Sequence, residues 1–277
     1  MYVRHTLFPT MVDAKVCNAA TGTTSTMRCY ICGKTAKEFN DFKTTKTENP
    51  EALKFGLSTL HARIRLFETL LHIAYKMPIK KWQARGEDEK NIVKETKKRI
   101  LKDVPKAGFG NSNSGNTARR FFSDPETASE ITGIDIGLIQ KFKVILEAIS
   151  SGHEIDETKF ANFAQETAEL YVKLYGWHPM TPTLHKILIH GNTIIKHALL
   201  PIGQLSEEAA EARNKHFRSY RLDFARKFSR VLCNKDIFNR LLLSSDPFLS
   251  CMRKRQKLRI SHPFLPETVK LFVQVGP

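Results

Sequence analysis

The sequence predicts a mainly α-helical protein with a small β portion near its N-terminus. From residue 57 onward, apolar residues recur at three- and four-residue steps, the spacing that places one apolar stripe on an α-helix. Before that point, residues 7–31 are rich in β-branched and turn-forming residues instead. With 277 residues, of which 41% are hydrophobic, the chain can bury a sizeable core in one or two domains.

Two short strands are expected in the β portion. Residues 7–18, L-F-P-T-M-V-D-A-K-V-C-N, are apolar and β-branched around a single acid, Asp13, and Pro9 argues against a helix. After a turn-prone tract, residues 27–31 can form a second strand that carries the start of a Cys-x2-Cys motif. On the pattern alone, Asp13 is more simply an exposed strand acid than a functional carboxylate.

Helices are expected over most of the remaining chain, after a polar, mobile connection at residues 34–49. The first helix starts after Ser58 and stops at Met77-Pro78, and a glycine-rich stretch at 108–116 is the clearest break in the chain. Further helices are expected within residues 80–106, at 137–150, at 157–175 with Asp156 as its cap, and after Pro182, where the helix carries His185 and His190.

A long final helix is expected from Ser206, its N-cap, to about residue 230. Glu207 and Glu208 lie in its first turn, where acids commonly do no more than complement the helix dipole. Its aromatic residues, Phe217, Tyr220, Phe224 and Phe228, are expected to face the core. Its basic residues then point outward; they are Arg213, Lys215, Arg218, Arg221, Arg226, Lys227 and Arg230. A shorter helix and the basic stretch M-R-K-R-Q-K-L-R follow, the latter typical of nuclear import or of non-specific nucleic-acid binding.

The charge of the chain favours a polyanionic partner. Lys and Arg outnumber Asp and Glu by 44 to 28, a formal charge of +16, so nucleic acid is the leading candidate. Arg119 and Arg120 precede Phe121 and Phe122, a pattern that can hold phosphate and stack bases, although such phenylalanines more often enter the core. The longest apolar runs are far shorter than the roughly 20 residues of a bilayer span, so an intracellular protein with no membrane partner is expected.

Four residues form a candidate zinc site. Cys29 and Cys32 have the spacing that directs two thiolates at one tetrahedral ion, and the glycine after Cys32 suits such a turn. His185 and His190 are a looser pair, because five helical residues rotate the second ring away from the first unless the helix unwinds at Gly191. The alternative, that these are small buried thiols and core or surface histidines, stays open on the pattern alone.

The order of these motifs resembles the C-terminal half of Transib-type DDE transposases and of the catalytic subunit of the V(D)J recombinase. The matching segments are V-D-A-K-V-C, C-Y-I-C, S-T-L-H-A-R-I, G-N-T-A-R-R, T-L-H-K-I-L-I-H and S-E-E-A-A-E-A-R-N-K. They run from about Thr10 to about Leu249. No single motif is diagnostic, but six in the right order are hard to obtain by chance.

The resemblance implies part of an RNase H-like catalytic fold that carries a helical zinc-binding insertion. In this reading residues 1–33 are a remnant of the sheet, 34–200 the insertion, 201–250 the catalytic and DNA-facing helices, and 251–277 a basic tail. Asp13 is similar to the second catalytic aspartate, and Glu208, in preference to Glu207, to the catalytic glutamate. These acids would hold Mg2+ or Mn2+, whereas Cys29, Cys32, His185 and His190 would hold a structural Zn2+.

The family's first aspartate has no counterpart among the twelve residues before Asp13, none of which is acidic. We therefore expect a truncated or domesticated fragment of a nuclear DDE recombinase, with DNA and no small-molecule substrate as its partner. A homodimer is compatible with this reading. The DNA contacts are expected from Arg119, Arg120, Lys215, Arg218 and Arg221. The alternative is a non-enzymatic, zinc-stabilised nucleic-acid-binding protein.

The 277-residue chain by itself is expected neither to nick DNA nor to join a 3′-hydroxyl to a target strand. Two carboxylates cannot hold the pair of metal ions that stabilises both the attacking and the leaving oxygens. A chain extended by the acid-bearing strand of a full-length relative should nick DNA in a Mg2+-dependent gel assay, and Asp13→Ala or Glu208→Ala should abolish the nicking. Metal-dependent cleavage by the unextended chain would contradict this prediction.

Overall fold

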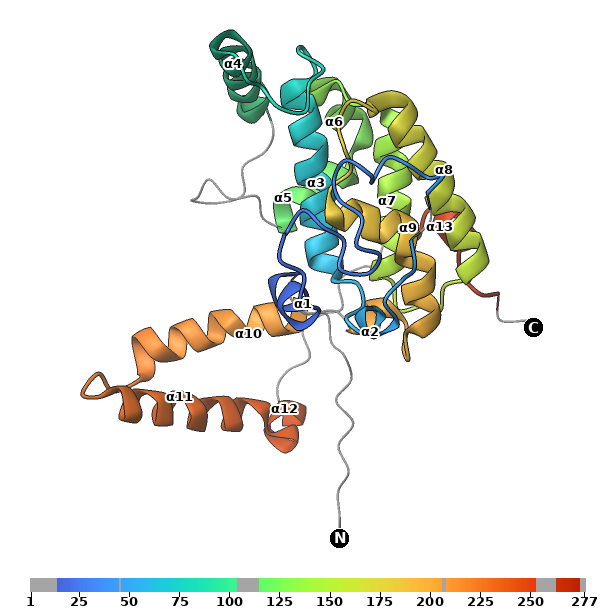
Figure 1. Ribbon diagram of the computed structural model, residues 1–277. Coiled ribbons are helices and arrows are strands. Elements are labelled where there is room, and N and C mark those ends of the chain that lie inside the picture. Colours follow the sequence, from blue (N-terminus) through green and yellow to red (C-terminus); the bar gives the residue numbers. More distant parts are fainter. Residues whose placement is uncertain (1–13, 45, 104–114, 206–207, 253–262, 275–277) are drawn as a thin grey trace. The chain divides into compact units, whose positions relative to one another are not determined.

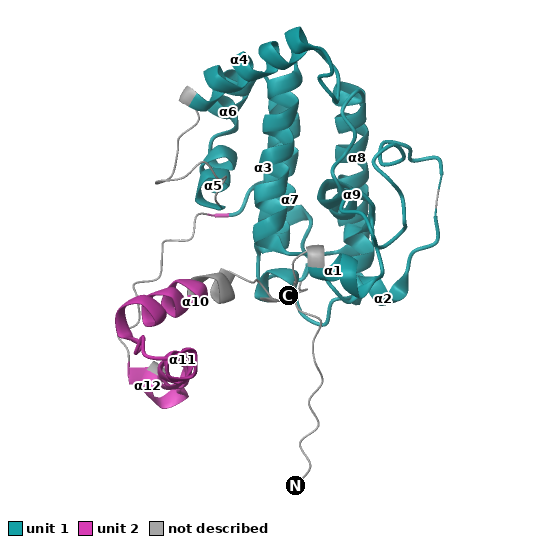
Figure 2. Ribbon diagram, turned by 60° about the vertical axis from the view of Figure 1, so that its left-hand side comes forward, with its two compact units in different colours: residues 1–206, 264–277 teal, residues 207–263 magenta. Residues whose placement is uncertain are grey.

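The computed structural model describes residues 14–44, 46–103, 115–205, 208–252 and 263–274 (Figure 1). The protein is 66% helical, which confirms the mainly α prediction. Within the described ranges there are no strands, only isolated antiparallel bridges that join Arg28 to Thr35 and Ile155 to Phe272. The chain divides into two compact units, residues 1–206 with 264–277 and residues 207–263 (Figure 2).

The first unit is a helical domain in which α3, α7, α8 and α9 surround the core (Figure 2). Helices α8 and α9 lie side by side and make the most extensive contact among the described helices. The elements of this unit are α1 (Ala14–Ala20), α2 (Pro50–Leu53), α3 (Thr59–Lys76), α4 (Glu87–Asp103), α5 (Gly115–Ser123), α6 (Pro125–Thr132), α7 (Ile136–Ser150), α8 (Glu157–Tyr175), α9 (Pro182–His197), the 3-10 turn η1 (Ile202–Leu205) and α13 (Pro266–Lys270).

Side-chain caps set the starts of the main helices. The Ser58 hydroxyl accepts the His61 N–H at 3.1 Å, and the Asp156 carboxylate accepts the Thr158 and Lys159 N–H groups at 3.0 Å. At α9 the Thr181 hydroxyl accepts the Leu184 N–H at 3.3 Å. These bonds satisfy N–H groups that have no partner within the helix, so the starts predicted at Ser58 and Asp156 are confirmed.

The strand predictions near the N-terminus are wrong for the described residues. Residues 14–18 belong to helix α1, whose sequence A-K-V-C-N-A-A contains three alanines, the best helix formers. Residues 27–31 form turns with the single Arg28 bridge, because no described strand lies beside them to build a ladder. Asp13 and the rest of residues 7–13 lie outside the described residues.

The polar segment at residues 34–49 packs against the domain, so the prediction of a mobile connection is wrong. Phe39 is fully buried, and the Lys34 ammonium donates to the Asp41 carbonyl at 2.8 Å. The Asn49 N–H donates to the Ile31 carbonyl at 2.8 Å, which ties the end of the segment to the Cys-x2-Cys turn. One buried aromatic and these bonds order a stretch whose composition is otherwise typical of a loop.

Helix α9 is continuous from Pro182 to His197, so it does not unwind at Gly191. A Cβ atom at Gly191 would lie 2.7 Å from Cε1 of Phe160, a fully buried ring on α8. The glycine therefore allows α8 and α9 to approach closely.

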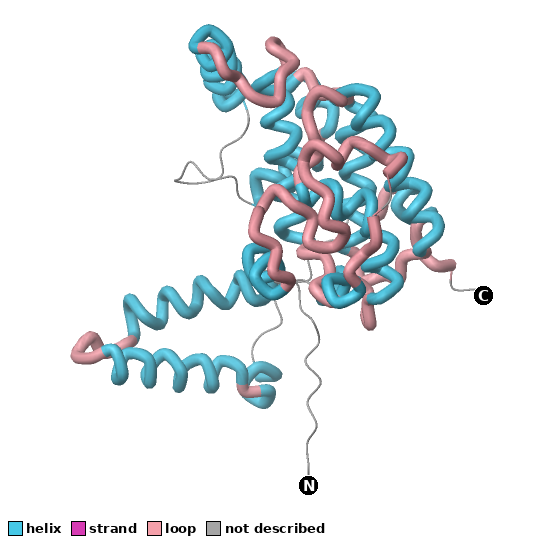
Figure 3. Tube along the Cα trace, in the orientation of Figure 1, coloured by secondary structure: helices cyan, strands magenta, loops and turns pink. Residues whose placement is uncertain are grey.

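The second unit is a helical hairpin of α10 (Glu208–Ser219), the π-helical turn η2 (Tyr220–Phe224), α11 (Arg230–Ser245) and α12 (Pro247–Met252) (Figure 3). Near one end, the Arg213 guanidinium donates to the Ser244 hydroxyl at 3.0 Å. Near the turn, Arg226 donates to the Asp236 carboxylate through its backbone N–H, Nε and Nη2 at 2.8–2.9 Å.

The single long helix predicted from residue 206 to about 230 is therefore wrong. Instead, α10 ends at Ser219 and is followed by the η2 turn. A separate helix, α11, begins after Ser229, whose hydroxyl accepts the Leu232 N–H at 3.2 Å. The expectation that the aromatic residues face a core also fails: Phe217, Phe224 and Phe228 are 41%, 52% and 95% exposed. The proposed cap Ser206, most of the glycine-rich stretch and most of the basic stretch at residues 252–259 lie outside the described residues.

His178 is a titratable group in the core of the first unit. His178 is 3% exposed. Its Nδ1 lies 3.1 Å from the Tyr171 hydroxyl, and its backbone carbonyl accepts the Asn40 side-chain N–H at 3.2 Å. Burial, with smaller contributions from Lys76 and His72, lowers the pKa of His178 to about 4.

We predict that His178 makes folding pH-dependent between its unfolded pKa near 6.5 and its folded pKa near 4. As the pH falls through this window, the unfolded chain binds a proton that the folded chain does not, so stability falls, by up to about 3 kcal/mol. Urea unfolding at several pH values should show a smaller decrease for His178→Asn than for the wild type. The matched change His197→Asn, at an exposed histidine, is the control for replacing an imidazole outside the core.

Candidate metal centre

The Cys-x2-Cys motif forms a tight turn that places both thiols inside the protein. The Gly33 N–H donates to the Cys29 carbonyl at 2.8 Å, and the Cys29 N–H donates to the Lys34 carbonyl at 2.9 Å. Gly33 adopts a φ of +69°, in the left-handed region that glycine enters without strain. Cys29 and Cys32 are 3% and 7% exposed, so their sulfur atoms lie in the core.

Helix α9 supplies two imidazoles to the same place. His185 and His190 are 1% and 3% exposed, and their ring centroids are 5.1 Å apart. The ring of Phe39, from the polar segment, stacks on His185 with a centroid distance of 4.5 Å and an interplanar angle of 23°. The two histidines therefore converge from a regular helix despite their five-residue separation.

The structure brings together the four residues that the sequence singled out. One ligand atom from each of Cys29, Cys32, His185 and His190 lies within 4.8 Å of the others, and all four residues are buried. Cys32 Sγ is 3.5 Å from His185 Nε2. In a tetrahedral zinc site, with bonds near 2.3 Å to sulfur and 2.0–2.1 Å to nitrogen, sulfur and nitrogen ligands lie about 3.6 Å apart. The cluster can therefore hold a metal ion such as zinc.

A buried nitrogen atom of His190 shows that the site fits a metal. Within the described residues, Nε2 of His190 and Nδ1 of His185 have no hydrogen-bond partner. A buried polar atom without a partner costs about 1–3 kcal/mol. A cation bound by Nε2 of His190 would remove that cost, because it takes the nitrogen lone pair that no donor in the core reaches.

The two thiols differ in acidity. A hydrogen bond with Cys29, reinforced by the nearby imidazoles of His185 and His190, lowers the pKa of Cys32 far below its ordinary value. The same bond with Cys32, together with burial, raises the pKa of Cys29. One proton is therefore shared within the pair, and Cys32 is the readier thiolate. Because a thiolate and not a thiol binds metal, the site is prepared for a cation at Cys32.

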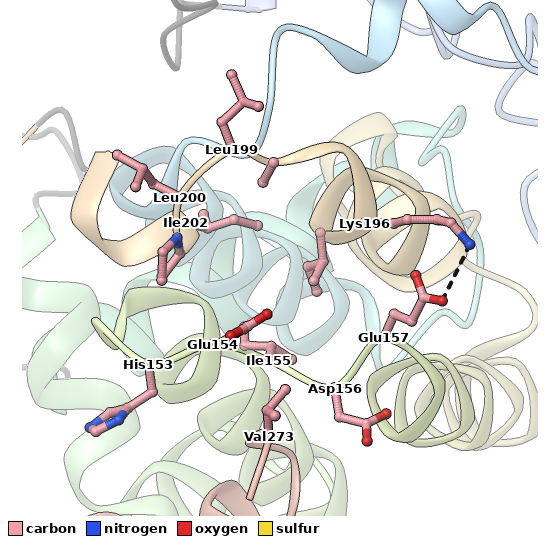
Figure 4. A pocket seen from close by; sticks show the side chains of 13 residues that line it. His153, Glu154, Ile155, Asp156, Glu157, Lys196, Leu199, Leu200, Ile202 and Val273 are labelled. Carbon is pink, nitrogen blue, oxygen red and sulfur yellow. Dashed lines mark hydrogen bonds and ion pairs between the residues drawn. The ribbon is translucent and has the colours of Figure 1, made fainter. Parts of the chain in front are cut away.

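A pocket with a volume of about 640 Å3 in the first unit lies away from this cluster (Figure 4). Two of its three acidic residues have structural roles: Asp156 caps α8, and Glu157 lies 3.3 Å from the Lys196 ammonium. The ring of His153 stacks on Phe272 with a centroid distance of 4.9 Å. Within the described residues, no other group of three or more His, Cys, Asp or Glu side chains is close enough to share a metal ion.

The structure leaves the proposed catalytic acids untested. Asp13 and Glu207 lie outside the described residues, and Glu208 is the first residue of α10, with a side chain that is not described. The predicted Mg2+ or Mn2+ site therefore stays a prediction.

The predicted DNA contacts fall on both units. Arg119 and Arg120 are exposed on α5, whereas Phe121 and Phe122 are 7% and 5% exposed, in the core. The core assignment of these phenylalanines is therefore confirmed, and base stacking on them is excluded in this conformation. The other three residues are exposed on the hairpin of the second unit; they are Lys215, Arg218 and Arg221.

Two residues of the centre were missed by the sequence analysis, Phe39 and Glu48. The aromatic character of Phe39 within a polar stretch was a signal that this stretch packs against the protein. Glu48 has no such signal, because an acid in a Lys- and Thr-rich segment is ordinarily solvated. Its carboxylate is hydrogen-bonded to Nδ1 of His190, a contact between residues 142 positions apart.

Comparison with known proteins adds no assignment: no family model matches this chain, and no significant similarity to a curated protein is found. The resemblance to Transib-type transposases therefore stays a prediction. No helix in the described part of the chain combines the length and the apolar character needed to cross a bilayer.

We predict that the purified protein contains one tightly bound zinc ion per chain and that Cys29→Ser removes it. A ligand at about 1,000 times its Kd stabilises the folded state by about 4 kcal/mol, so the Tm should fall by roughly 10 °C without the metal. Metal analysis by mass spectrometry and thermal unfolding with and without a chelator measure both effects.

Cys17→Ser is the matched control, because Cys17 is also a buried thiol of this unit but lies outside the cluster. It should keep the zinc ion and the chelator-dependent fall in Tm. Wild-type protein without zinc, or equal zinc content in wild type and Cys29→Ser, would contradict the assignment.

Proposed function

We propose that this chain is a DNA-binding protein of the DDE recombinase class whose helical domain is built around a structural zinc ion. The observation that carries the proposal is the buried cluster of Cys29, Cys32, His185 and His190. The Transib-type resemblance implies these four residues as ligands from motif matches alone, and their side chains converge in the core. An independent geometric feature of the fold therefore agrees with the motif assignment.

The donor set favours zinc in a structural role. Two thiolates and two imidazoles are the ligands of structural zinc sites, and four protein ligands leave no open position for a water or a substrate. Two thiolates also balance the 2+ charge, so the occupied site is neutral and suits a buried location. The zinc would hold the Cys-x2-Cys turn against α9.

The second unit supplies the surface for DNA. Residues 207–263 contain 14 Lys and Arg against six Asp and Glu, so about a fifth of the chain carries half of the formal charge of +16. Lys215, Arg218 and Arg221 recur at three-residue steps and are exposed. Among the described residues none of the three forms an ion pair, whereas Arg226 is engaged by Asp236. Unpaired, exposed cations release counterions from DNA and bind its phosphates without sequence preference.

The catalytic part of the proposal rests on the resemblance. Asp13 and Glu208 would contribute carboxylates to a Mg2+ or Mn2+ site of an RNase H-like fold, where paired divalent ions promote cleavage and strand transfer. A nuclear location and a homodimer belong to the same proposal. The helical domain around the zinc ion would correspond to the insertion in that fold.

We predict that the protein binds duplex DNA in a salt-dependent manner through the hairpin. Replacing Arg218 and Arg221 with Glu should lower the affinity for unrelated duplexes alike, by at least about tenfold near 100 mM salt. Because each lost phosphate contact reduces the slope of log K against log salt by about one, that slope should fall by about two. Fluorescence anisotropy with two duplexes of different sequence over a salt series measures both quantities.

The double change Lys94→Glu with Lys98→Glu is the matched control, because it alters the net charge equally on an exposed face of α4 in the other unit. It should reduce affinity much less and leave the salt slope near that of the wild type. Equal losses in the two double variants would show that net charge alone drives binding. Affinity that does not change with salt would contradict DNA binding through phosphates.

A further inference from the structure

We propose that Glu48 is a positioning residue of the metal centre, which orients His190 and strengthens its bond to zinc. The inference rests on the proposed zinc ion and adds to it a carboxylate from a polar segment outside the ligand motifs. Its basis is the hydrogen bond between Glu48 Oε1 and His190 Nδ1, a contact between side chains that are 31% and 4% exposed.

This hydrogen bond decides which nitrogen of His190 is free to bind metal. A carboxylate only accepts hydrogen bonds, so the Nδ1–H of the ring must donate to Glu48. In the neutral imidazole the lone pair is then on Nε2, the buried atom that has no partner among the described residues. Glu48 thus presents Nε2 to the two thiols and prevents the tautomer that would carry a proton there.

The backbone next to Glu48 is attached both to the Cys-x2-Cys turn and to helix α2. The next residue, Asn49, donates its N–H to the carbonyl of Ile31, which lies between the two cysteines and is 2% exposed. The Asn49 side chain accepts the Glu51 N–H at 3.1 Å and so caps α2. The Cys-x2-Cys turn and α2 therefore fix the position from which Glu48 reaches α9.

The other acids of this segment have different partners. Glu38 accepts from the Thr35 N–H and hydroxyl at 2.9 Å and pairs with Lys46, and Asp41 accepts from the Lys43 N–H at 2.9 Å and from the Thr44 hydroxyl at 2.6 Å. Neither contacts a ligand of the centre in the described structure. Glu48 is therefore the acid of the segment that is engaged with the cluster.

The two histidines are held differently, which makes the role of Glu48 specific. His185 is oriented by its stack on Phe39, and its Nδ1 has no hydrogen-bond partner among the described residues. His190 has the carboxylate. A carboxylate that accepts the N–H of a ligating imidazole makes the ring a stronger donor, and loss of such a partner typically weakens metal binding 10- to 100-fold.

The test measures zinc affinity in Glu48→Ala and Glu48→Gln of the full 277-residue chain by competition with a chromophoric chelator. We expect Glu48→Ala to bind zinc 10- to 100-fold more weakly than the wild type. Glu48→Gln can still accept the N–H through its amide oxygen but lacks the charge, so its affinity should lie between the two. Because Gln has nearly the shape of Glu, this variant keeps the test valid if Glu48→Ala does not fold.

A second readout separates positioning from general stability. Long-range 1H–15N spectra of the metal-free protein report the tautomer of each histidine, and His190 should carry its proton on Nδ1 in the wild type and lose this preference in Glu48→Ala. Glu38→Ala is the control, because it removes bonds to Thr35 and Lys46 in the same segment without touching His190. It should retain the His190 tautomer and bind zinc within about threefold of the wild type.

The outcomes distinguish this inference from the proposed function. Wild-type protein that binds zinc with the same affinity as both Glu48 variants would overturn the role of Glu48 and leave the zinc centre intact. An equal loss of affinity in Glu38→Ala and Glu48→Ala would also overturn it, because order in the segment would then be the cause. Wild-type protein that binds no zinc would overturn both proposals.

Discussion

The contact between the Cys-x2-Cys turn and helix α9 is the constraint on which the first unit depends. It joins Cys32 to His185 across 153 positions of the chain, and the helices from α2 to α8 lie within the loop that it closes. Closing a loop of about this length costs the chain roughly 4–5 kcal/mol of entropy, so a metal ion at this point gives a long-range stabilisation that few single contacts provide. At the same point the buried Nε2 of His190 has no hydrogen-bond partner among the described residues, and a cation would engage it.

The polar segment before α2 is organised by this centre. It contributes an aromatic ring that stacks on one ligand, a carboxylate that holds the other, and a backbone bond to the residue between the two cysteines. A stretch so rich in Lys and Thr buries little apolar surface of its own, and it becomes ordered because its few apolar and acidic groups all find partners in one place. Order in the segment and geometry at the site are therefore coupled.

The second unit has a different balance of forces. Among its described residues only Ile237 and Ser244 are buried, while large apolar side chains such as Phe228 and Phe248 are 95% and 73% exposed. Its hairpin is held mainly by polar bonds, the Arg226 contacts with Asp236 and the Arg213 contacts with the serines near the end of α11. Exposed ion pairs contribute little free energy in water, so this unit should open at a lower free energy than the first.

The sequence by itself determined the features that depend on neighbouring residues. The caps at Ser58 and Asp156 and the apolar periodicity after them predicted α3 and α8, because a cap and an amphipathic stripe act within a few turns of one helix. The Cys-x2-Cys spacing likewise predicted half of a metal site. Only the tertiary structure decided the rest. Gly191 serves close packing of α8 against α9, and Glu48 meets His190 across 142 positions. In each case the deciding partner is distant in sequence, and no local pattern of charge or apolar residues specifies which distant groups a fold brings together.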